Sequence, residues 1–442
     1  MANHNQNFFG LNILILVFLI SLSNNIIEIP IQSIEKSLSS KQETILVDNF
    51  LLIGKVKIGS NNQEFNLVLD TTSSITWVAL NGSNDSFTIN NHYNPNESKT
   101  SKKTDKQFEI EKFGYFSKGY YYDDEIQFMD NKKLNFKFGS ASETKLDAKN
   151  IDGMIGLAYN YEEEQLSFLN SLKNSGITDT LSFSISIDGN ESKLEINGTM
   201  YLGKHEDFSK KETISCPLKF DKYKDYWSYN IKSFILNNTL NEIKSEKTFQ
   251  FIFDTASNSI VLPEEYFNDI KNNLAIFGCK YVTSGNIGAL TYNLACEDET
   301  KLPNIKLKIN GQMFIIPKEF AFYQHFGISY SKIIFQGENA IIGTPFFILF
   351  HTLFDKEKKM LRFYPKQSEW IERGQIEEED PESDSENKGF NINYLFYIIP
   401  SIIIVIIIII IVIVFVRKKK GNNKDNFEFG LEQNDEENAL VN

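Results

Sequence analysis

Residues 67–75 read Leu-Val-Leu-Asp-Thr-Thr-Ser-Ser-Ile, and residues 251–259 read Phe-Ile-Phe-Asp-Thr-Ala-Ser-Asn-Ser. In both stretches three apolar residues lead to Asp-Thr, and a Ser follows after one further residue. A Phe also stands five positions before each aspartate, as Phe65 and Phe249. Self-similarity at a long period indicates repeated structural units. The chain therefore contains an internal duplication with one carboxylate, Asp70 or Asp254, at the centre of each copy.

A second pair of elements repeats in the same order. Met154-Ile155-Gly156 follows Asp70, and Ile341-Ile342-Gly343 follows Asp254 after a similar length of chain. Two lobes with one aspartate each can face one another, which would bring the two carboxylates together.

Several further motifs have a characteristic order and spacing. Trp77-Val78 follows the first aspartate, and the later motifs are His-Tyr-Asn-Pro-Asn-Glu-Ser-Lys-Thr (92–100), Ile-Asp-Gly-Met-Ile-Gly-Leu (151–157), Gly-Thr-Met-Tyr-Leu-Gly (198–203), Tyr-Trp (226–227), Ala-Ile-Ile-Gly-Thr-Pro-Phe-Phe (340–347) and Leu-Phe-Asp (353–355). Together they resemble the pepsin-like aspartic proteases from about Phe50 to Pro365. The resemblance implies an all-β, bilobal fold with a cleft between two β-rich lobes, at 48–215 and 216–370.

The resemblance implies that Asp70 and Asp254 form a catalytic dyad. Peptide hydrolysis without a metal or a covalent intermediate needs one group to take a proton from water and another to protonate the product. Two carboxyl groups in contact cannot both ionise cheaply, so they share a proton and titrate as a pair with separated pKa values. An aspartic endopeptidase that works in acid, on peptide bonds between apolar residues, is therefore expected.

Four hydroxyl groups flank the two aspartates. By resemblance, Thr71 and Thr255 bond across to the opposite lobe, and Ser73 and Ser257 bond the outer carboxylate oxygens. Such donors would hold the carboxyl groups coplanar.

A hairpin at Phe108 to Phe128 is expected to close over the cleft as a flap. The Tyr-Gly of the family is replaced by Phe113-Gly114, and Tyr115 could supply the missing hydroxyl to the indole of Trp77. Trp77 and Phe113 could also be ordinary core aromatics.

Two residues depart from the family pattern, because Thr72 and Ala256 stand where glycine is usual. If the backbone at Thr72 had a positive φ, a β-branched residue there would cost about 1–3 kcal/mol and displace the carboxyl group. With a negative φ the change would only narrow the cleft. The alternative function is a catalytically weak or inactive membrane-tethered protein that binds peptides in a pepsin-like cleft.

Other functions find little support in the sequence. The chain has no His-Glu-x-x-His or Gly-x-Ser-x-Gly motif, so a metal or serine hydrolase is not expected, nor any cofactor. A formal charge of −13 disfavours nucleic acid as a partner. The expected partners are a polypeptide substrate and a membrane, and the protein is expected to be a monomer.

The ends of the chain indicate a membrane anchor. Residues 1–23 read as a signal peptide, and residues 24–47 resemble a propeptide, which would make the protein a zymogen. An acidic linker (371–393) precedes the uncharged segment 394–416, which as a helix would span about 35 Å against a hydrocarbon core of about 30 Å. The basic cluster 417–420 then places the tail (417–442) in the cytosol. The catalytic region is expected to be lumenal or extracellular, on a secretory, vacuolar, lysosomal or plasma membrane.

An oxidising lumen permits disulfides and glycosylation. By resemblance Cys279 and Cys296 form a disulfide, although two buried thiols remain the alternative, and Cys216 is left over. Asn-x-Ser/Thr sequons, typical of a glycoprotein, occur at Asn81, Asn84, Asn96, Asn190, Asn197 and Asn237.

Strands are expected in the β-branched and aromatic runs at 51–58, 64–69, 126–128, 181–187, 248–253 and 305–309. Helices are expected at 163–174 and at 263–273, the second opened by a proline in its first turn.

Overall fold

The computed structural model describes residues 27–35, 50–85, 89–112, 115–128, 132–145, 151–160, 166–189, 196–203, 213–284, 291–325, 327–338 and 340–374. All of them belong to one compact unit that ends at Glu377. Within these ranges no helix is long and apolar enough to cross a membrane. The expected signal peptide (1–23), the membrane segment (394–416), the tail (417–442) and most of the acidic linker lie outside them.

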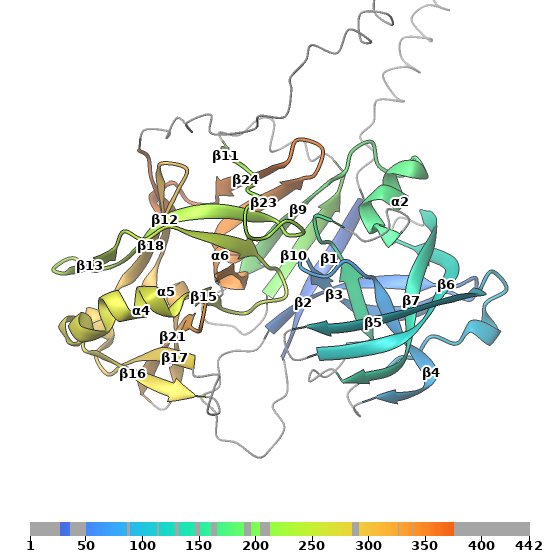
Figure 1. Ribbon diagram of the computed structural model, residues 1–442, viewed down its shortest axis with the longest axis horizontal. Coiled ribbons are helices and arrows are strands. Elements are labelled where there is room, and N and C mark those ends of the chain that lie inside the picture. The colour runs from blue at the N-terminus through green and yellow to red at the C-terminus, as the bar shows by residue number, and fades with distance from the viewer. Residues whose placement is uncertain are drawn as a thin grey trace, which may run out of the picture. The chain divides into compact units, whose positions relative to one another are not determined.

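The first sheet has thirteen strands. They run in the spatial order β11 (Ile214–Pro217), β24 (Met360–Pro365), β23 (Phe350–Asp355), β9 (Ser182–Gly189), β10 (Ile196–Leu202), β1 (Ile27–Glu35), β2 (Phe50–Ile58), β3 (Gln63–Asp70), β8 (Gly153–Gly156), β4 (Trp77–Asp85), β7 (Lys133–Lys145), β6 (Tyr115–Gln127) and β5 (Lys102–Lys112). β23 and β24, orange in Figure 1, come from the second half of the chain, and β23 pairs with the green β9. This sheet therefore joins the two halves.

The second sheet is built from the second half alone. Its main path is β16 (Cys279–Ser284), β17 (Thr291–Cys296), β21 (Ile328–Phe335), β15 (Ile260–Leu262), β22 (Ile341–Ile342), β14 (Phe249–Phe253), β12 (Ser228–Asn237), β18 (Asn304–Ile309), β19 (Gln312–Ile316) and β25 (Ile371–Glu372), with β13 (Glu242–Ser245) on β12 and β20 (Phe322–His325) on β21. The described α-helices are short: α2 (Phe168–Asn174), α4 (Glu264–Ile270), α5 (Lys318–Ala321) and α6 (Thr344–Leu349). The β-rich fold expected from the resemblance is confirmed.

Strand β1 lies inside the first sheet. Its residue Ile27 pairs with Leu202 of β10, and Ile31 pairs with Gly54 of β2. The isoleucines at alternate positions are buried and the residues between them are exposed, as a strand with one face on the core requires. Residues 27–35, within the segment that resembles a propeptide, are thus part of the folded sheet.

Aromatic side chains fill the junction between the halves. Trp227 meets Phe183 of β9 and Phe354 of β23 edge-on, and these two phenylalanines stack with their centroids 4.5 Å apart. Such pairs each contribute about 0.5–1.5 kcal/mol beyond the area they bury. They hold β9 and β23 together where strands from distant parts of the chain meet.

Most of the expected elements are present with shifted ends. All the expected strands overlap observed ones, but 126–128 is only the end of the long strand β6. The helix expected at 163–174 begins at Phe168, because the Ser167 side chain accepts a hydrogen bond from the Asn170 amide and caps it. Pro263 precedes α4 as its N-cap, and a 3₁₀ segment at Lys271–Phe277 follows the helix.

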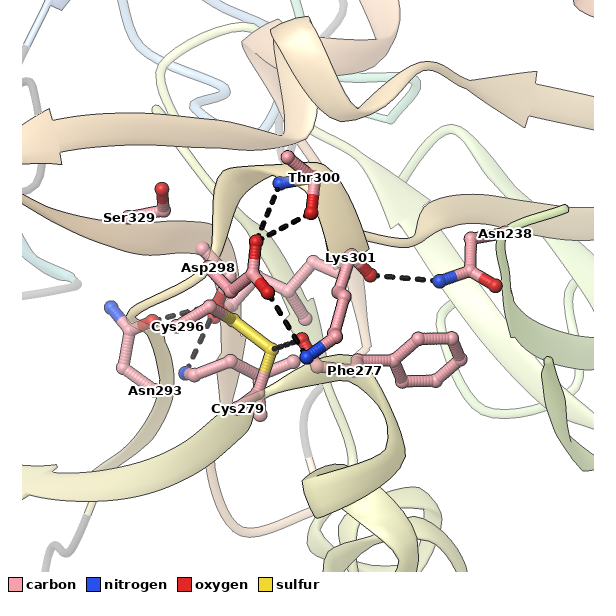
Figure 2. Close-up of a disulfide and its surroundings, with 12 residues drawn as sticks. Asn238, Phe277, Cys279, Asn293, Cys296, Asp298, Thr300, Lys301 and Ser329 are labelled. Atoms are coloured by element: carbon pink, nitrogen blue, oxygen red, sulfur yellow. Dashed lines mark hydrogen bonds and ion pairs between the residues drawn. A yellow bond between two sulfur atoms is a disulfide. The ribbon is translucent and has the colours of Figure 1, made fainter. Parts of the chain in front are cut away.

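The disulfide between Cys279 and Cys296 is present, as expected (Figure 2). It joins the paired ends of β16 and β17. Beside it Asp298 accepts hydrogen bonds from the amide and hydroxyl of Thr300 and pairs with Lys301 at 3.0 Å. Cys216 is a buried thiol in β11.

Candidate active site

Each aspartate stands at the end of a buried strand that has a parallel neighbour. Asp70 is the last residue of β3, in register with Gly156 of β8. Asp254 follows β14, and its amide donates to the carbonyl of Ile342 in β22 at 2.9 Å. The duplicated Met-Ile-Gly and Ile-Ile-Gly elements therefore support the two aspartate loops in equivalent ways.

The glycines of these elements are needed for close packing. A Cβ atom on Gly156 would lie 2.8 Å from backbone atoms of Ile75 and Ser73, and one on Gly343 would lie 2.4 Å from the carbonyl oxygens of Ser257 and Ser259. Backbone cannot move away from such contacts cheaply, so only glycine fits.

The two aspartate loops are bonded to one another. The hydroxyl of Thr71 donates to the carbonyl of Phe253 at 2.7 Å, and the hydroxyl of Thr255 donates to the carbonyl of Leu69 at 2.6 Å. Each hydroxyl also accepts from the amide of the other threonine, at 3.2 and 3.1 Å. The cross-lobe contacts expected of these threonines are confirmed, and they bring the loops that carry Asp70 and Asp254 together.

Both carboxyl groups are buried, with 1% of Asp70 and 5% of Asp254 exposed. The amide of Thr72 donates to Oδ1 of Asp70 at 2.7 Å, and the amide of Ala256 donates to Oδ1 of Asp254 at 2.8 Å. The Thr72 hydroxyl donates to the same Oδ1 of Asp70 at 2.6 Å.

The replacement of glycine by Thr72 and Ala256 strains neither backbone. Among the described residues, the non-glycine positions with positive φ are Asn62, Asn310 and Lys359. The first of the two sequence alternatives, a strained left-handed Thr72, is therefore wrong. Thr72 is accommodated with an ordinary backbone and adds a donor beside the carboxylate.

The two serines differ from their expected role. The Ser73 hydroxyl donates to the carbonyl of Ile75 at 3.2 Å, and the Ser257 hydroxyl donates to the carbonyl of Ser259 at 3.0 Å. A hydroxyl has one proton to donate. In this geometry each serine proton therefore stabilises the turn after its aspartate rather than a carboxylate oxygen.

Trp77 lies in an apolar cluster beside the first loop. Phe108 and Tyr121, from the two arms of the β5–β6 hairpin, contact each other with ring centroids 5.5 Å apart and pack in this cluster with Met154. Ala256 from the other half packs against the same cluster. The sequence does not predict that Phe108, Tyr121 and Met154 pack together, because cross-strand register cannot be read from composition.

The β5–β6 hairpin occupies the segment expected to be the flap, and its first arm begins earlier than predicted, at Lys102. The indole N–H of Trp77 is buried and has no hydrogen-bond partner within the described part of the chain. The backbone of Tyr115 pairs with Lys112, but its side chain and the residues Phe113 and Gly114 lie outside the described part. The proposed contact of Tyr115 with the indole therefore stays a prediction.

The described residues contain no group of three or more His, Cys, Asp or Glu side chains that could hold a metal ion.

Comparison with known proteins agrees with this geometry. The family model described as eukaryotic aspartyl protease matches residues 52–366. The chain is 23% identical to gastricsin of Mus musculus over 67% of its own length and 74% of that protein. It is 25% identical to vacuolar protease A of Aspergillus fumigatus (64% and 70% covered) and 24% identical to pepsin A of Bos taurus (71% and 83% covered).

Two buried carboxyl groups on duplicated, mutually bonded loops define a protein of the aspartic protease class. The chain belongs to the eukaryotic aspartyl protease family.

Proposed function

We propose that this protein is an aspartic endopeptidase that hydrolyses peptide bonds between apolar residues in acid, with Asp70 and Asp254 as its catalytic dyad. The single observation that carries the proposal is the reciprocal bonding of Thr71 and Thr255. Catalytic groups must be held in a fixed relative geometry, and these bonds connect the two aspartate loops directly.

The chemistry follows from two carboxyl groups that share a proton. The ionised carboxylate takes a proton from a water molecule as that water attacks the peptide carbonyl, and the protonated partner donates to the developing oxyanion. The proton taken from water then passes from the carboxyl group to the nitrogen of the leaving amine. Because one carboxyl group must be protonated and the other ionised, activity is expected over a window in acid.

The specificity for apolar residues is supported by the surroundings of the dyad. Ile75, Ile110 and Ala256 are only partly buried and pack against the cluster that contains Trp77. Ligand sites are lined mainly by such side chains, with few polar groups. A substrate side chain placed next to the first loop would meet this apolar surface.

A membrane-tethered peptide-binding protein with little or no turnover is the second candidate. The observation that favours it is the presence of Thr72 at a glycine position, because a threonine side chain occupies space beside the carboxylate. The unstrained backbone at Thr72 favours retained catalysis.

The location is proposed from the sequence. The uncharged segment 394–416 followed by Arg417 and three lysines would make a single-pass anchor with the proteolytic region in the lumen or outside the cell. Removal of residues 24–47 from a zymogen, which would take β1 out of the first sheet, is proposed as well. Glycosylation and a monomeric state are also proposed.

Cleavage of an unfolded protein by the full-length chain, after incubation in acid, tests the function across about pH 3 to 7. Activity confined to acid, blocked by pepstatin and abolished in both Asp70→Asn and Asp254→Asn, supports the dyad. Activity that persists in Asp254→Asn would overturn it. No turnover together with pepstatin binding by the wild-type chain would favour the peptide-binding protein.

A further inference from the structure

Thr72 places two donors on one carboxylate oxygen. Its amide lies 2.7 Å and its hydroxyl 2.6 Å from Oδ1 of Asp70. Thr72 is 3% exposed and Asp70 is 1% exposed, so water cannot readily replace either hydrogen bond. Hydrogen bonds to a buried charged group are the strong ones, and losing a donor leaves that charge poorly compensated.

At the position matching Thr72, the second half of the chain carries an alanine, which has no hydroxyl. Ala256 occupies the matching position, and its methyl group cannot donate, although its amide lies 2.8 Å from Oδ1 of Asp254. The neighbouring Ser73 does not provide the bond either, because its hydroxyl donates to the Ile75 carbonyl. The residue that departs from the family pattern at position 72 thus provides a hydroxyl that donates to Asp70.

We propose that Thr72 is a positioning residue of the dyad: its hydroxyl fixes the Asp70 carboxylate and makes the two halves of the dyad unequal. The inference rests on the proposed function, in which Asp70 reacts with water. Two donors on Oδ1 stop the carboxylate from rotating about its Cβ–Cγ bond. A hydrogen bond to the charged form of a carboxyl group also favours that form. Thr72 therefore gives the first aspartate a side-chain donor that Ala256, at the matching position, cannot give the second.

Four variants of the full-length chain separate the hydroxyl from the bulk of the side chain. Thr72→Ser keeps the hydroxyl, Thr72→Val keeps the shape without it, and Thr72→Gly restores the residue usual in the family. The matched control is Thr352→Val, which removes a buried hydroxyl that donates to the Phe350 carbonyl, outside the aspartate loops. All four are compared with the wild type by thermal unfolding, by kcat and KM, and by the pH dependence of kcat and of pepstatin binding.

If Thr72 positions the carboxylate, Thr72→Val and Thr72→Gly lower kcat by roughly ten- to a hundredfold with KM within about twofold. The acid limb of their kcat profiles moves to higher pH, because more alkaline solution is then needed to ionise the dyad. Thr72→Ser stays within about threefold of the wild type, the range expected when the donor is kept. Thr352→Val lowers stability without moving the pH profile.

Thr72→Gly gives the decisive comparison. If the threonine merely narrows the cleft, glycine raises activity or lowers KM and leaves the acid limb in place, which overturns the proposal. Equal pH profiles for Thr72→Val and the wild type also overturn it.

Failure of the proposed function gives a different result. In that case the wild type shows no turnover, or the Asp70→Asn variant keeps its turnover. The pH dependence of pepstatin binding still reports on the two carboxyl groups. A shift of that dependence in Thr72→Val but not in Thr352→Val supports the positioning role even without turnover. Binding that is unchanged in every variant, or absent from the wild type, contradicts it.

Discussion

Thr71 and Thr255 exchange hydrogen bonds across the two halves of the chain: each amide donates to the hydroxyl of the other residue, at 3.2 and 3.1 Å. Each hydroxyl in turn donates to a carbonyl of the opposite loop. Both threonines are fully buried, so their amides and hydroxyls depend on the opposite half of the chain for these hydrogen bonds.

Replacement of Thr255 by Val should therefore weaken both the fold and the activity. It leaves the buried amide of Thr71 and the carbonyl of Leu69 without a partner, at a cost of about 1–3 kcal/mol for each unsatisfied group. Urea unfolding measures the loss, and Thr255→Ser, which keeps the hydroxyl, should recover most of it. A Thr255→Val protein as stable as Thr255→Ser would show that these bonds contribute little.

Asp152 organises the loop that precedes β8. Its fully buried carboxylate accepts from the amides of Asn66 and Asn91 at 2.8 Å and from the Asn91 side chain at 3.0 Å. In Asp152→Asn the side-chain NH₂ would face one of these donors, so unfolding should cost about 2–3 kcal/mol less than in the wild type. The exposed Asp105→Asn is the control, and it should change the free energy of unfolding by less than about 0.5 kcal/mol.

Lys366 is a partly buried positive charge with a measurable pH signature. Burial lowers its pKa from 10.5 to about 8, and Asp188, 3.8 Å away and largely exposed, offsets only part of this effect. The side chain is 16% exposed. Because the pKa in the folded state lies below that in the unfolded state, the unfolded chain binds more protons between pH 8 and 10.5. Stability should therefore rise with pH across that window.

The Lys366→Met variant removes the cost of burying this charge. The cost is fully present below about pH 8, so the variant should be more stable than the wild type by roughly 1–2 kcal/mol at neutral pH. The difference in stability should vanish as the pH approaches the pKa of this lysine in the unfolded chain, 10.5. Thermal unfolding of both proteins from neutral to alkaline pH measures it, with the exposed Lys358→Met as the matched control. A pH-independent difference would mean that packing, not charge, is responsible.

The disulfide closes a loop with a sequence separation of 17 residues. A crosslink over a loop of this size stabilises a protein by about 3 kcal/mol in the chain-entropy model. The double variant Cys279→Ala/Cys296→Ala should therefore unfold at a lower temperature, and a reductant should lower the melting temperature of the wild type but not of the double variant. An unchanged melting temperature in the double variant would contradict this expectation.

The duplication predicted the arrangement around the two aspartates well. In each half, the apolar strand before the aspartate pairs in parallel with the strand that leads to the repeated glycine. The register of this pairing places Gly156 or Gly343 against backbone atoms of the loop after the aspartate, where only glycine fits. The cross-lobe bonds of Thr71 and Thr255 were also expected. These features depend on local sequence that occurs twice, which is why they could be read from it.

The remaining details depend on torsion angles and strand register. Whether the Ser73 hydroxyl donates to a carboxylate or to the Ile75 carbonyl depends on side-chain rotation within the turn, and the same holds for Thr72. The meeting of Phe108 with Tyr121 depends on the bulged pairing of β5 with β6. Neither kind of information is present in a pattern of residue types.

The first sheet also constrains the order in which the protein can fold. β1, near the start of the chain, pairs with β10, and β9 pairs with β23, whose residues Phe350–Asp355 are among the last of the sheet to be synthesised. Sheets with such distant partners close slowly, and until then their strands expose unpaired edges. A chain that ends before Phe350 would present the open edge of β9 to other molecules, so truncated forms should aggregate rather than fold as half-proteins.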